Sequence, residues 1–412
     1  MEQAYEDAVA ALYDHRTFRG KISLDPIRAV MEALGHPEQD FPAVHVAGTN
    51  GKGSTATMLA GALEEAGYRT GLFTSPHLTD FRERVRVDGD RISRRAVVDR
   101  YRDVAATDVD TSFFECMTAM AFDHFARADV DIAVVETGMG GRVDATNVVE
   151  PACSVITNVA REHTRWLGET PEQIAYELAG IAEADVPLVS GATGPPEDVI
   201  AAAARAEGAP LRGVDPRAAP VADDRLALTL DIDGRPVETG LVGRYQVDNV
   251  DTALAALDAL DRDVPRAAVR DALAGLQVPG RMEPVARSPL VLLDGAHNPE
   301  AVQRLPATLA DIETGRVTAA ASIMADKDCG AMLSTLEDVA DRIVLAEADI
   351  DRAADPSDLA DHVEATDCAV VPDPADALHA AVDTASADDT VLVTGSLYFV
   401  GDVKAVLEGA GL

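Results

Sequence analysis

A lysine stands between two glycines in the segment VHVAGTNGKGST, which covers residues 44–55 of this 412-residue chain. An apolar β-branched run precedes the glycines, and the amphipathic pattern TATMLAGALEEAG follows them. A strand, a glycine-rich loop with lysine and serine, and then a helix form a phosphate-binding loop, because the N–H groups of the loop and the helix start face one anion. We therefore expect Lys52 to reach the terminal phosphates of a nucleotide, and Ser54 or Thr55 to reach a metal ion.

The spacing of this loop differs from the commonest phosphate-binding pattern, GxxxxGK[ST]. Val46 stands where the first glycine is expected, and Gly53 separates Lys52 from Ser54. A glycine turn without a ligand is the alternative, but the strand before the loop and the helix after it favour a nucleotide. The dinucleotide pattern GxGxxG is absent, so the sequence predicts a mononucleotide with magnesium.

Polar side chains also follow three other apolar runs, at the points where we expect strands to end. The run GLFT is followed by Ser75 and His77, IAVVE ends in Glu136, and CSVITNV is followed by Glu162 and His163. Ligands of open α/β sheets collect at the carboxyl ends of the strands, and Mg²⁺ prefers oxygen ligands. Glu136 is therefore the strongest candidate metal ligand, with a surface cap as the alternative. His163 alone is a weak candidate, because histidine is not a usual magnesium ligand.

A mostly parallel sheet must position these residues, because short β-branched runs alternate with longer helical patterns. The predicted strands of the first half are residues 43–47, 70–74, 131–137, 153–159 and 187–191, and the predicted helices include 54–66 and 113–127. The pattern changes around residues 225–240. Two alternating runs joined at Asp233-Gly234 predict an antiparallel hairpin there.

The second half of the chain restarts the alternation of strands and helices. It begins after a helix-rich stretch, residues 247–276, and the segment VPGRMEP, residues 278–284, whose two prolines and glycine predict a hinge. The predicted strands are the runs PLVLLDGA, TAAASIM, DRIVLAEA, CAVVPD and TVLVTGS. We predict a second, smaller α/β domain.

The chain is strongly acidic, with 71 Asp and Glu against 35 Lys and Arg and a net charge of −36. The acidic residues are spread along the whole chain, which is typical of proteins that work at very high salt, so we expect a cytoplasmic protein of a salt-accumulating cell. The clustered positive charge that nucleic acid or an anionic membrane requires is missing. The sequence also has no basic-apolar leader pattern, no apolar run long enough to span a bilayer, and no CxxC pair among its four cysteines.

Taken together, the motifs resemble the folylpolyglutamate synthase/dihydrofolate synthase family of the Mur ligase superfamily. The matching segments are GTNGKGS (48–54), TSPHL (74–78), RERV (82–85), FFECMTAMAFDHF (113–125), ETGMGGRVDATN (136–147), LVGRYQVDNVDTALAA (241–256), PGRME (279–283), LDGAHNPEA (293–301), ADKD (325–328) and VTGSLYFVG (393–401). They follow the order of the family and cover almost the whole chain. The GTNGKGS, DATN and DGAHNP segments are the most specific.

The resemblance implies an α/β fold with two domains. Residues 1–282 would form an N-terminal P-loop domain with a mostly parallel sheet and a small antiparallel hairpin region. Residues 283–412 would form a smaller C-terminal α/β domain, which is Rossmann-like. The last matching segment ends at residue 401, and whether the natural chain continues into a further C-terminal domain stays open.

The resemblance also implies an ATP-dependent ligase. ATP phosphorylates a carboxylate, and the amine of L-glutamate then displaces phosphate from the acyl phosphate to form an amide. The implied acceptors are dihydropteroate, tetrahydrofolate polyglutamates, or both, and the implied cofactors are ATP and Mg²⁺, with K⁺ as a further candidate cation. We expect a monomer of folate biosynthesis and one-carbon metabolism whose partners are these small molecules, and neither nucleic acid nor a membrane.

The site residues implied by the resemblance fall into four groups. The ATP-binding group is Gly48, Thr49, Asn50, Gly51, Lys52, Gly53, Ser54, Asn249, Arg281 and Asp294. The metal group is Ser75, Glu136 and His163. The pterin-side group is Phe113, Phe114, Met117, Val143, Asp144 and Ala145, and His297 and Ser396 are candidates for the glutamate side. Lys52, His163 and Arg281 are the implied catalytic residues.

Three positions depart from the pattern of the family. Leu178, in YELAGI, stands where the family has a lysine whose carbamate supports a second magnesium ion. Glu162 replaces an aspartate before the metal-site histidine, and Tyr245 replaces a histidine of bacterial members. Because leucine cannot take up CO2 or bind a metal, we predict activity without carbamylation. Two rival functions stay open: a Mur-type amino-acid ligase on another carboxylate, and a nucleotide-binding protein without ligase activity, which only Leu178 supports.

Overall fold

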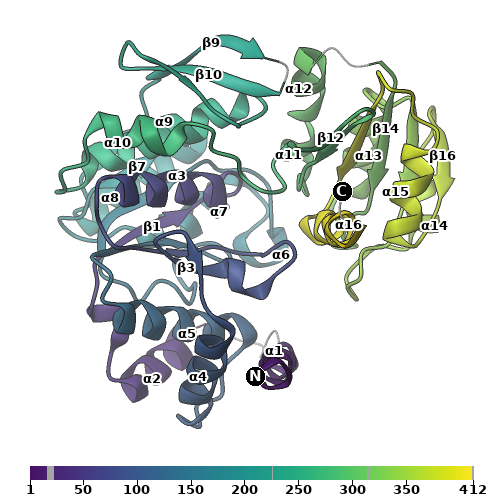
Figure 1. Cartoon of the computed structure of the whole chain (residues 1–412). Coiled ribbons are helices and arrows are strands. Elements are labelled where there is room, and N and C mark those ends of the chain that lie inside the picture. The colour runs from purple at the N-terminus through teal and green to yellow at the C-terminus, as the bar shows by residue number, and fades with distance from the viewer. Residues whose placement is uncertain (16–22, 225, 313–314, 411–412) are drawn as a thin grey trace. The chain divides into compact units, whose positions relative to one another are not determined.

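The computed structural model describes residues 1–15, 23–224, 226–312 and 315–410 (Figure 1). As far as these residues are described, they form two compact units. Unit 1 comprises Met1–His77, Phe81–Ala218 and Asp248–Leu273, and unit 2 comprises Leu78–Asp80, Ala219–Val247 and Ala274–Leu412. Both units have an α/β architecture, as the sequence predicts. The domain boundary between residues 282 and 283 stays a prediction.

Unit 1 is built on an eight-stranded sheet with the order β4-β3-β2-β5-β1-β6-β7-β8. Its strands are β1 (Ala43–Ala47), β2 (Thr70–Phe73), β3 (Val85–Val87), β4 (Asp90–Arg91), β5 (Ile132–Glu136), β6 (Pro151–Ile156), β7 (Leu188–Ser190) and β8 (Leu211–Gly213). The six strands from β2 to β8 in this order are parallel, and β3 and β4 extend one edge as antiparallel strands. The five strands predicted for this half are therefore confirmed.

Helices cover both faces of this sheet. Those of unit 1 are α1 (Glu2–Asp14), α2 (Asp25–Leu34), α3 (Lys52–Glu65), α4 (Arg94–Ala105), α5 (Phe113–Ala128), α6 (Thr164–Leu167), α7 (Pro171–Leu178), α8 (Pro195–Glu207) and α10 (Arg266–Leu273), with 3₁₀ turns η1 (Pro37–Gln39), η2 (Phe81–Arg84) and η3 (Ala179–Ile181). Figure 1 shows α3 and α10 on one face and α2, α4 and α5 on the other. The glycine loop thus leads from the central strand β1 into a helix that packs on the sheet.

The start and the buried face of α5 follow directly from its sequence. Ser112 accepts a hydrogen bond from the N–H of Glu115, and the Glu115 carboxylate accepts one from the N–H of Ser112, which is a capping box. The helix then buries Phe122 and Phe125, whose rings meet the Phe41 ring edge-to-face with centroids 5.8 Å apart. This aromatic core fixes the helix whose first turn carries the predicted pterin-side residues.

A three-stranded sheet, β11-β10-β9, lies in unit 2 apart from Ala218, and its strands β10 and β11 pair antiparallel. Its strands are β9 (Ala218–Asp224), β10 (Ala227–Ile232) and β11 (Pro236–Glu238). Asp233 and Gly234 form the turn between β10 and β11 with positive φ angles of 53° and 78°. Such angles suit Asp-Gly, so the hairpin prediction is confirmed. The helix α9 (Tyr245–Ala259) follows and runs from unit 2 into unit 1.

The main sheet of unit 2 has six strands in the order β12-β13-β17-β14-β15-β16. They are β12 (Glu283–Arg287), β13 (Leu290–Leu293), β14 (Val317–Ala321), β15 (Arg342–Leu345), β16 (Asp367–Val370) and β17 (Thr390–Thr394). All neighbouring pairs are parallel except β12 with β13. The helices are α11 (Pro299–Val302), α12 (Leu305–Ile312), α13 (Cys329–Glu337), α14 (Pro356–Ala360), α15 (Pro374–Val382) and α16 (Leu397–Ala410).

A partly buried ion pair joins α16 to β12 in unit 2. The Lys404 ammonium lies 2.7 and 2.9 Å from the two carboxylate oxygens of Glu283, and both side chains are about 15% exposed. Glu283 also accepts a hydrogen bond from the N–H of Gly280, 2.9 Å away. The pair therefore fixes the segment PGRME against the last helix.

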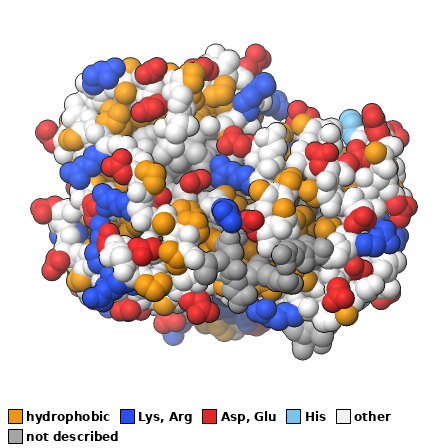
Figure 2. Space-filling model, turned by 90° about the horizontal axis from the view of Figure 1, so that it is seen from above, with side chains coloured by type: hydrophobic (Ala, Val, Ile, Leu, Met, Phe, Trp, Pro, Cys, Tyr) orange, Lys and Arg blue, Asp and Glu red, His pale blue; other side chains and the backbone are white. Residues whose placement is uncertain are grey.

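The surface agrees with the dispersed acidity of the sequence. Figure 2 shows acidic side chains scattered over the visible face, with basic ones interspersed among them. Within the described part of the chain, no helix combines the length and apolar character needed to cross a bilayer.

Candidate functional site

The glycine loop after β1 is packed too closely for any residue other than glycine at two of its positions. Gly48 and Gly51 have φ angles of +139° and +81°. A Cβ at Gly48 would collide with the Thr157 hydroxyl, and one at Gly51 would collide with the side-chain amide of Asn249. Bare backbone that curls at the start of a helix is what a phosphate-binding loop requires, so the loop fits a nucleotide phosphate.

Lys52 opens helix α3, and Gly51 is its N-cap. The Lys52 ammonium donates hydrogen bonds to the carbonyl oxygens of Gly48 and Thr49, at 2.9 and 3.0 Å. These bonds hold the side chain across the loop rather than away from it. The positive charge and the N–H groups of the first helical turn are thereby concentrated at one place.

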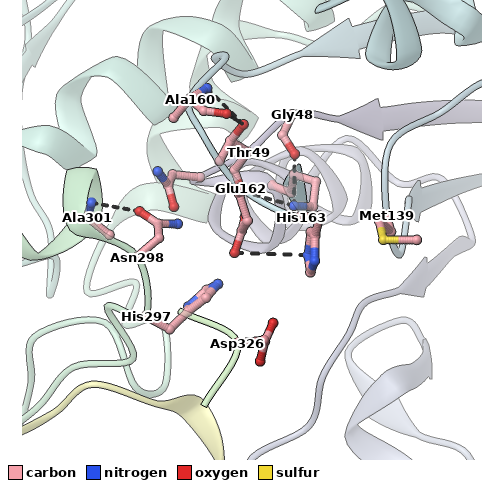
Figure 3. Close-up of polar contacts among 12 residues, drawn as sticks. Gly48, Thr49, Met139, Ala160, Glu162, His163, His297, Asn298, Ala301 and Asp326 are labelled. Atoms are coloured by element: carbon pink, nitrogen blue, oxygen red, sulfur yellow. Dashed lines mark hydrogen bonds and ion pairs between the residues drawn. The ribbon is translucent and has the colours of Figure 1, made fainter. Parts of the chain in front are cut away.

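The segment after β6 anchors the loop. The hydroxyl of Thr49 lies 3.3 Å from the Ala160 carbonyl oxygen and 2.9 Å from the Ala160 nitrogen (Figure 3). The N–H of Asn50 donates to the side chain of Asn158 at 2.9 Å, and its carbonyl accepts from Thr157 at 2.7 Å. Thr157 and Asn158 are not among the site residues predicted from the sequence, although a polar pair directly after an apolar strand is a signal of such a site.

Two of the three predicted metal ligands lie together beside the glycine loop. The carboxylate of Glu136, at the end of β5, is 4% exposed and accepts a hydrogen bond from the N–H of Ser75 at 2.8 Å. A Cβ at Gly53 would lie 3.5 Å from the same carboxylate. Because β2, β5 and β1 are neighbours, their carboxyl ends bring Ser75, Glu136 and the loop to one edge of the sheet.

His163 lies after the anchoring segment, in a left-handed conformation with φ 50°. Its Nε2 atom is 4.0 Å from the carboxylate of the buried Glu162, as Figure 3 shows. Among the described residues, no group of three or more His, Cys, Asp and Glu side chains could hold a metal ion. The Ser75 and Glu136 oxygens still fit Mg²⁺, which is bound through one or two carboxylates together with phosphate oxygens and water. The role of His163 stays a prediction.

The loop after Glu136 is organised around the carboxylate of Asp144, which is 6% exposed. It accepts hydrogen bonds from the N–H groups of Gly138, Met139 and Thr146, at 2.9 to 3.0 Å, and from the Thr146 hydroxyl at 2.5 Å. Burial raises the pKa of Asp144, while the bonds from Thr146, Met139 and Gly138 lower it. The carboxylate therefore closes the glycine-rich loop on itself.

The other predicted pterin-side residues lie on or near the start of α5. The Phe113 ring stacks on Tyr13 with centroids 5.1 Å apart and has the Arg84 guanidinium 5.4 Å from its centroid. The Phe114 ring fills the space that a Cβ at Gly138 would occupy. Met117 is fully buried in the core of unit 1. Its contact with a substrate stays a prediction, as do those of Val143 and Ala145, which flank Asp144.

In unit 2, the predicted ATP contacts Arg281 and Asp294 lie next to each other. Asp294 is 4% exposed and accepts hydrogen bonds from the N–H groups of Met282 and Ala296, both at 2.9 Å, and from the Tyr245 hydroxyl at 3.4 Å. Burial raises the pKa of Asp294, and the nearby Arg281 charge lowers it. Burial also raises the pKa of Tyr245 well above its usual value, and the Asp294 charge raises it further. The hydroxyl is therefore a donor to Asp294.

The predicted glutamate-side residues of unit 2 also have defined positions. The Nδ1 atom of His297 lies 2.8 Å from the Gly295 carbonyl oxygen. Asn298, beside it, caps α11 through a 2.9 Å bond from the N–H of Ala301 (Figure 3). Ser396 is 1% exposed, and its hydroxyl accepts from the N–H of Tyr398 at 3.1 Å. Their roles stay predictions.

Leu178, at the position of the carbamylated lysine, ends helix α7 and is 1% exposed. It packs with Ile174, Ala175 and Ile181 in an apolar cluster of unit 1. Neither its own side chain nor these neighbours supply an oxygen or nitrogen ligand, so a carbamate-supported second metal does not fit this position.

Comparison with known proteins identifies two domain types in the chain. Residues 46–185 match the Mur ligase middle domain, and residues 280–397 match the Mur ligase, glutamate ligase domain. A curated relative from Haloferax volcanii, described as a probable bifunctional folylpolyglutamate synthase/dihydropteroate synthase, is 39% identical over 97% of the chain. The chain spans 50% of the length of this relative.

Two solved structures are similar over nearly their whole length. Escherichia coli FolC in complex with DHPP and ADP has a TM-score of 0.90 and 32% identity, over 99% of this chain and 98% of that one. A bifunctional folylpolyglutamate synthase/dihydrofolate synthase from Yersinia pestis, complexed with AMPPNP and a Mn ion, has a TM-score of 0.87, 32% identity and the same coverage.

Proposed function

Because the chain belongs to the folylpolyglutamate synthase/dihydrofolate synthase family of Mur ligases, we propose that it joins L-glutamate to a folate-type carboxylate with ATP. The acceptors are dihydropteroate, tetrahydrofolate polyglutamates, or both. The observation that carries the proposal is the meeting of three strand ends in unit 1, where Lys52, Ser75 and the Glu136 carboxylate lie around one glycine loop.

The reaction has two steps. An oxygen of the acceptor carboxylate attacks the γ-phosphorus of ATP, the bond from phosphorus to the β-phosphate oxygen breaks, and ADP leaves. The neutral amine of glutamate then attacks the acyl carbon, the bond from that carbon to the phosphate oxygen breaks, and phosphate leaves. The nitrogen gives up one proton to solvent and keeps the other as the amide N–H. The chain needs no nucleophile of its own for this chemistry, because positioning and charge neutralisation supply the catalysis.

The residues of unit 1 perform distinct parts of the first step. The N–H groups of residues 48–54 and the Lys52 ammonium hold the phosphates and neutralise the charge that develops on them. Ser75, Glu136 and His163 would hold Mg²⁺, which adds further positive charge when bound. Asn249 lies against Gly51 and keeps the curl of the loop.

The remaining proposed roles concern residues of unit 2 and the residues of unit 1 that would contact the acceptor. Arg281 neutralises phosphate charge, and Asp294 accepts hydrogen bonds from the ribose. Phe113 and Phe114 offer aromatic faces, and Asp144 a hydrogen-bond acceptor, to the flat pterin. We assign His297 and Ser396 to the glutamate side.

The cellular setting is also part of the proposal. A net charge of −36 spread over the surface suits a monomer that works in a cytoplasm with molar salt, and the relative from Haloferax volcanii supports this setting. Neither nucleic acid nor a membrane is proposed as a partner.

One assay tests the ligase activity. The protein is incubated in molar KCl with ATP, Mg²⁺ and L-glutamate, with 7,8-dihydropteroate or tetrahydrofolate added separately, and ADP and the glutamylated product are quantified. Product with one acceptor or both supports the proposal and identifies the acceptor. ADP formed without either product would favour a ligase for another carboxylate. Nucleotide binding without ADP formation would favour a protein without ligase activity.

A further inference from the structure

A histidine lies at the centre of β1, a strand whose other residues are apolar. His45 is 1% exposed, and its Nε2 atom lies 2.8 Å from the hydroxyl of Thr146, which is fully buried. Thr146 belongs to the loop that Asp144 closes, so this contact joins the strand of the glycine loop to the predicted pterin-side loop. A polar contact between two buried side chains 101 positions apart fixes how the loop lies on the sheet.

The direction of each hydrogen bond in this chain follows from the groups involved. The Asp144 carboxylate only accepts, so the Thr146 hydroxyl donates its proton to Asp144 across 2.5 Å. The hydroxyl oxygen must then accept from His45, which places the imidazole proton on Nε2. The Nδ1 atom of His45 is buried and has no hydrogen-bond partner among the described residues, so it carries no proton. Burial lowers the pKa of His45 to about 3, which agrees with a neutral ring.

The Asp144 carboxylate also holds the backbone that follows Glu136. Its second oxygen accepts from the N–H groups of Gly138 and Met139, at 3.0 and 2.9 Å. His45 lies three residues before Gly48, a span of about 10 Å in a strand. Strand β1 therefore leads into the glycine loop at its end, and its histidine helps to orient the predicted pterin-side loop.

We propose that His45 is a positioning residue for the pterin-side carboxylate of Asp144, on which it acts through Thr146. This inference rests on the proposed function, because it assigns Asp144 to an acceptor with N–H groups on a flat heterocycle. With the Nε2–H of His45 directed at it, Thr146 has only one way to turn its hydroxyl, toward Asp144. The Asp144 carboxylate is thus held in one orientation, with both oxygens fixed by hydrogen bonds, and we expect the substrate to meet it in that orientation.

Paired substitutions separate positioning from a purely structural role. His45→Phe fills the space without a donor, whereas His45→Gln offers an amide N–H near the position of Nε2. Thr146→Val removes the hydroxyl at nearly constant shape, and Thr146→Ser restores it. We expect His45→Phe and Thr146→Val to raise KM for the pterin acceptor about tenfold, which corresponds to the loss of one hydrogen bond. KM for ATP should stay within about twofold, and His45→Gln and Thr146→Ser should recover most of the loss.

Ser154 provides the matched control for buried polarity. It is opposite His45 in the register of β1 and β6, is 1% exposed, and donates a hydrogen bond to the Ile181 carbonyl oxygen at 2.9 Å. Ser154→Ala should lower the unfolding temperature without changing KM for the acceptor. An equal rise of KM in Ser154→Ala would overturn the proposal, and so would an unchanged KM in folded His45→Phe or Thr146→Val. If His45→Phe does not fold, Thr146→Val decides the question.

A binding measurement keeps this test apart from the test of ligase activity. Acceptor affinity of the same variants is measured by calorimetry with 7,8-dihydropteroate, in molar KCl. A wild-type protein that turns over but shows no dependence on His45 or Thr146 overturns this inference alone. A protein that binds the pterin with the expected dependence but makes no product overturns the ligase proposal alone. A wild-type protein that neither binds nor converts the pterin overturns both.

Discussion

The buried histidine of β1 predicts how the stability of the protein depends on pH. The pKa of His45 falls from 6.5 to about 3 on folding, because burial opposes the charged ring. Between these values the unfolded chain binds a proton that the folded chain excludes. Unfolding therefore takes up a proton in this window, so the free energy of unfolding decreases as the pH falls below 6.5 and is unaffected well above it.

The size of the effect follows from the same two values. Each pH unit below the unfolded pKa costs about 1.4 kcal/mol, so going from about pH 7.5 to about pH 5 should remove roughly 2 kcal/mol of stability through His45 alone. Burial raises the pKa values of Asp144 and Asp294, which changes stability in the opposite direction, but both groups are present in the wild type and in a His45 variant. The difference between the two proteins isolates the histidine.

The assay is urea unfolding of the wild type and His45→Gln in molar KCl, where salt screens the surface charges. We expect the wild type to lose about 2 kcal/mol more than His45→Gln between about pH 7.5 and about pH 5. His124→Gln serves as a comparison, since its partly buried ring also has a pKa lowered by burial and should account for a smaller share. Parallel pH profiles of the wild type and His45→Gln would refute the argument that His45 is neutral and desolvated.

Four further outcomes follow from the structure. Lys52→Ala should lower turnover at least about a hundredfold with the fold intact, and Lys52→Arg should not restore it, because a planar guanidinium does not replace a compact ammonium in the loop; steady-state kinetics and circular dichroism check both. Gly51→Ala should weaken ATP binding, because φ is +81° and the new Cβ meets Asn249, whereas Gly67→Ala, with φ +89° and open space, should change stability only; calorimetric titration with ATP compares them. Turnover should not respond to added bicarbonate, since Leu178 cannot form a carbamate, and activation by bicarbonate in CO2-depleted buffer would contradict this. Dilution from molar to millimolar KCl should lower the unfolding temperature, because a net charge of −36 is then unscreened; a melting curve unaffected by salt would count against adaptation to high salt.

The elements that the sequence specified best are those with strong local signals. Strand β1 has the predicted bounds, 43–47, because five buried residues end abruptly at a glycine. Helix α5 begins at Phe113 as predicted, because both residues of its capping box, Ser112 and Glu115, lie close together at the helix start. Helix α3 begins at Lys52 rather than at Ser54, because Gly51 in its left-handed conformation serves as N-cap and brings the lysine into the first turn.

The features that the sequence did not reveal depend on distant partners. Strand β12 escaped prediction because EPVAR is short, polar and interrupted by proline, and it forms only by antiparallel pairing with β13. The edge strands β3 and β4 contain only three and two residues. His45 gave no functional signal, because its role appears only when Thr146, far along the chain, packs beside it. The clustering of Ala219–Val247 with unit 2 likewise follows from contacts that no local pattern encodes.

The ion pair between Lys404 and Glu283 behaves differently from the surface pairs when the ionic strength changes. At molar salt, mobile ions screen charges over about 3 Å, so pairs of exposed side chains contribute little. Lys404 and Glu283 are only about 15% exposed, so mobile ions reach this pair less than they reach exposed pairs. This pair keeps more of its attraction at high salt than exposed pairs do, so it can hold the start of β12 against the last helix in the saline cytoplasm that we propose for this chain of 71 acidic residues.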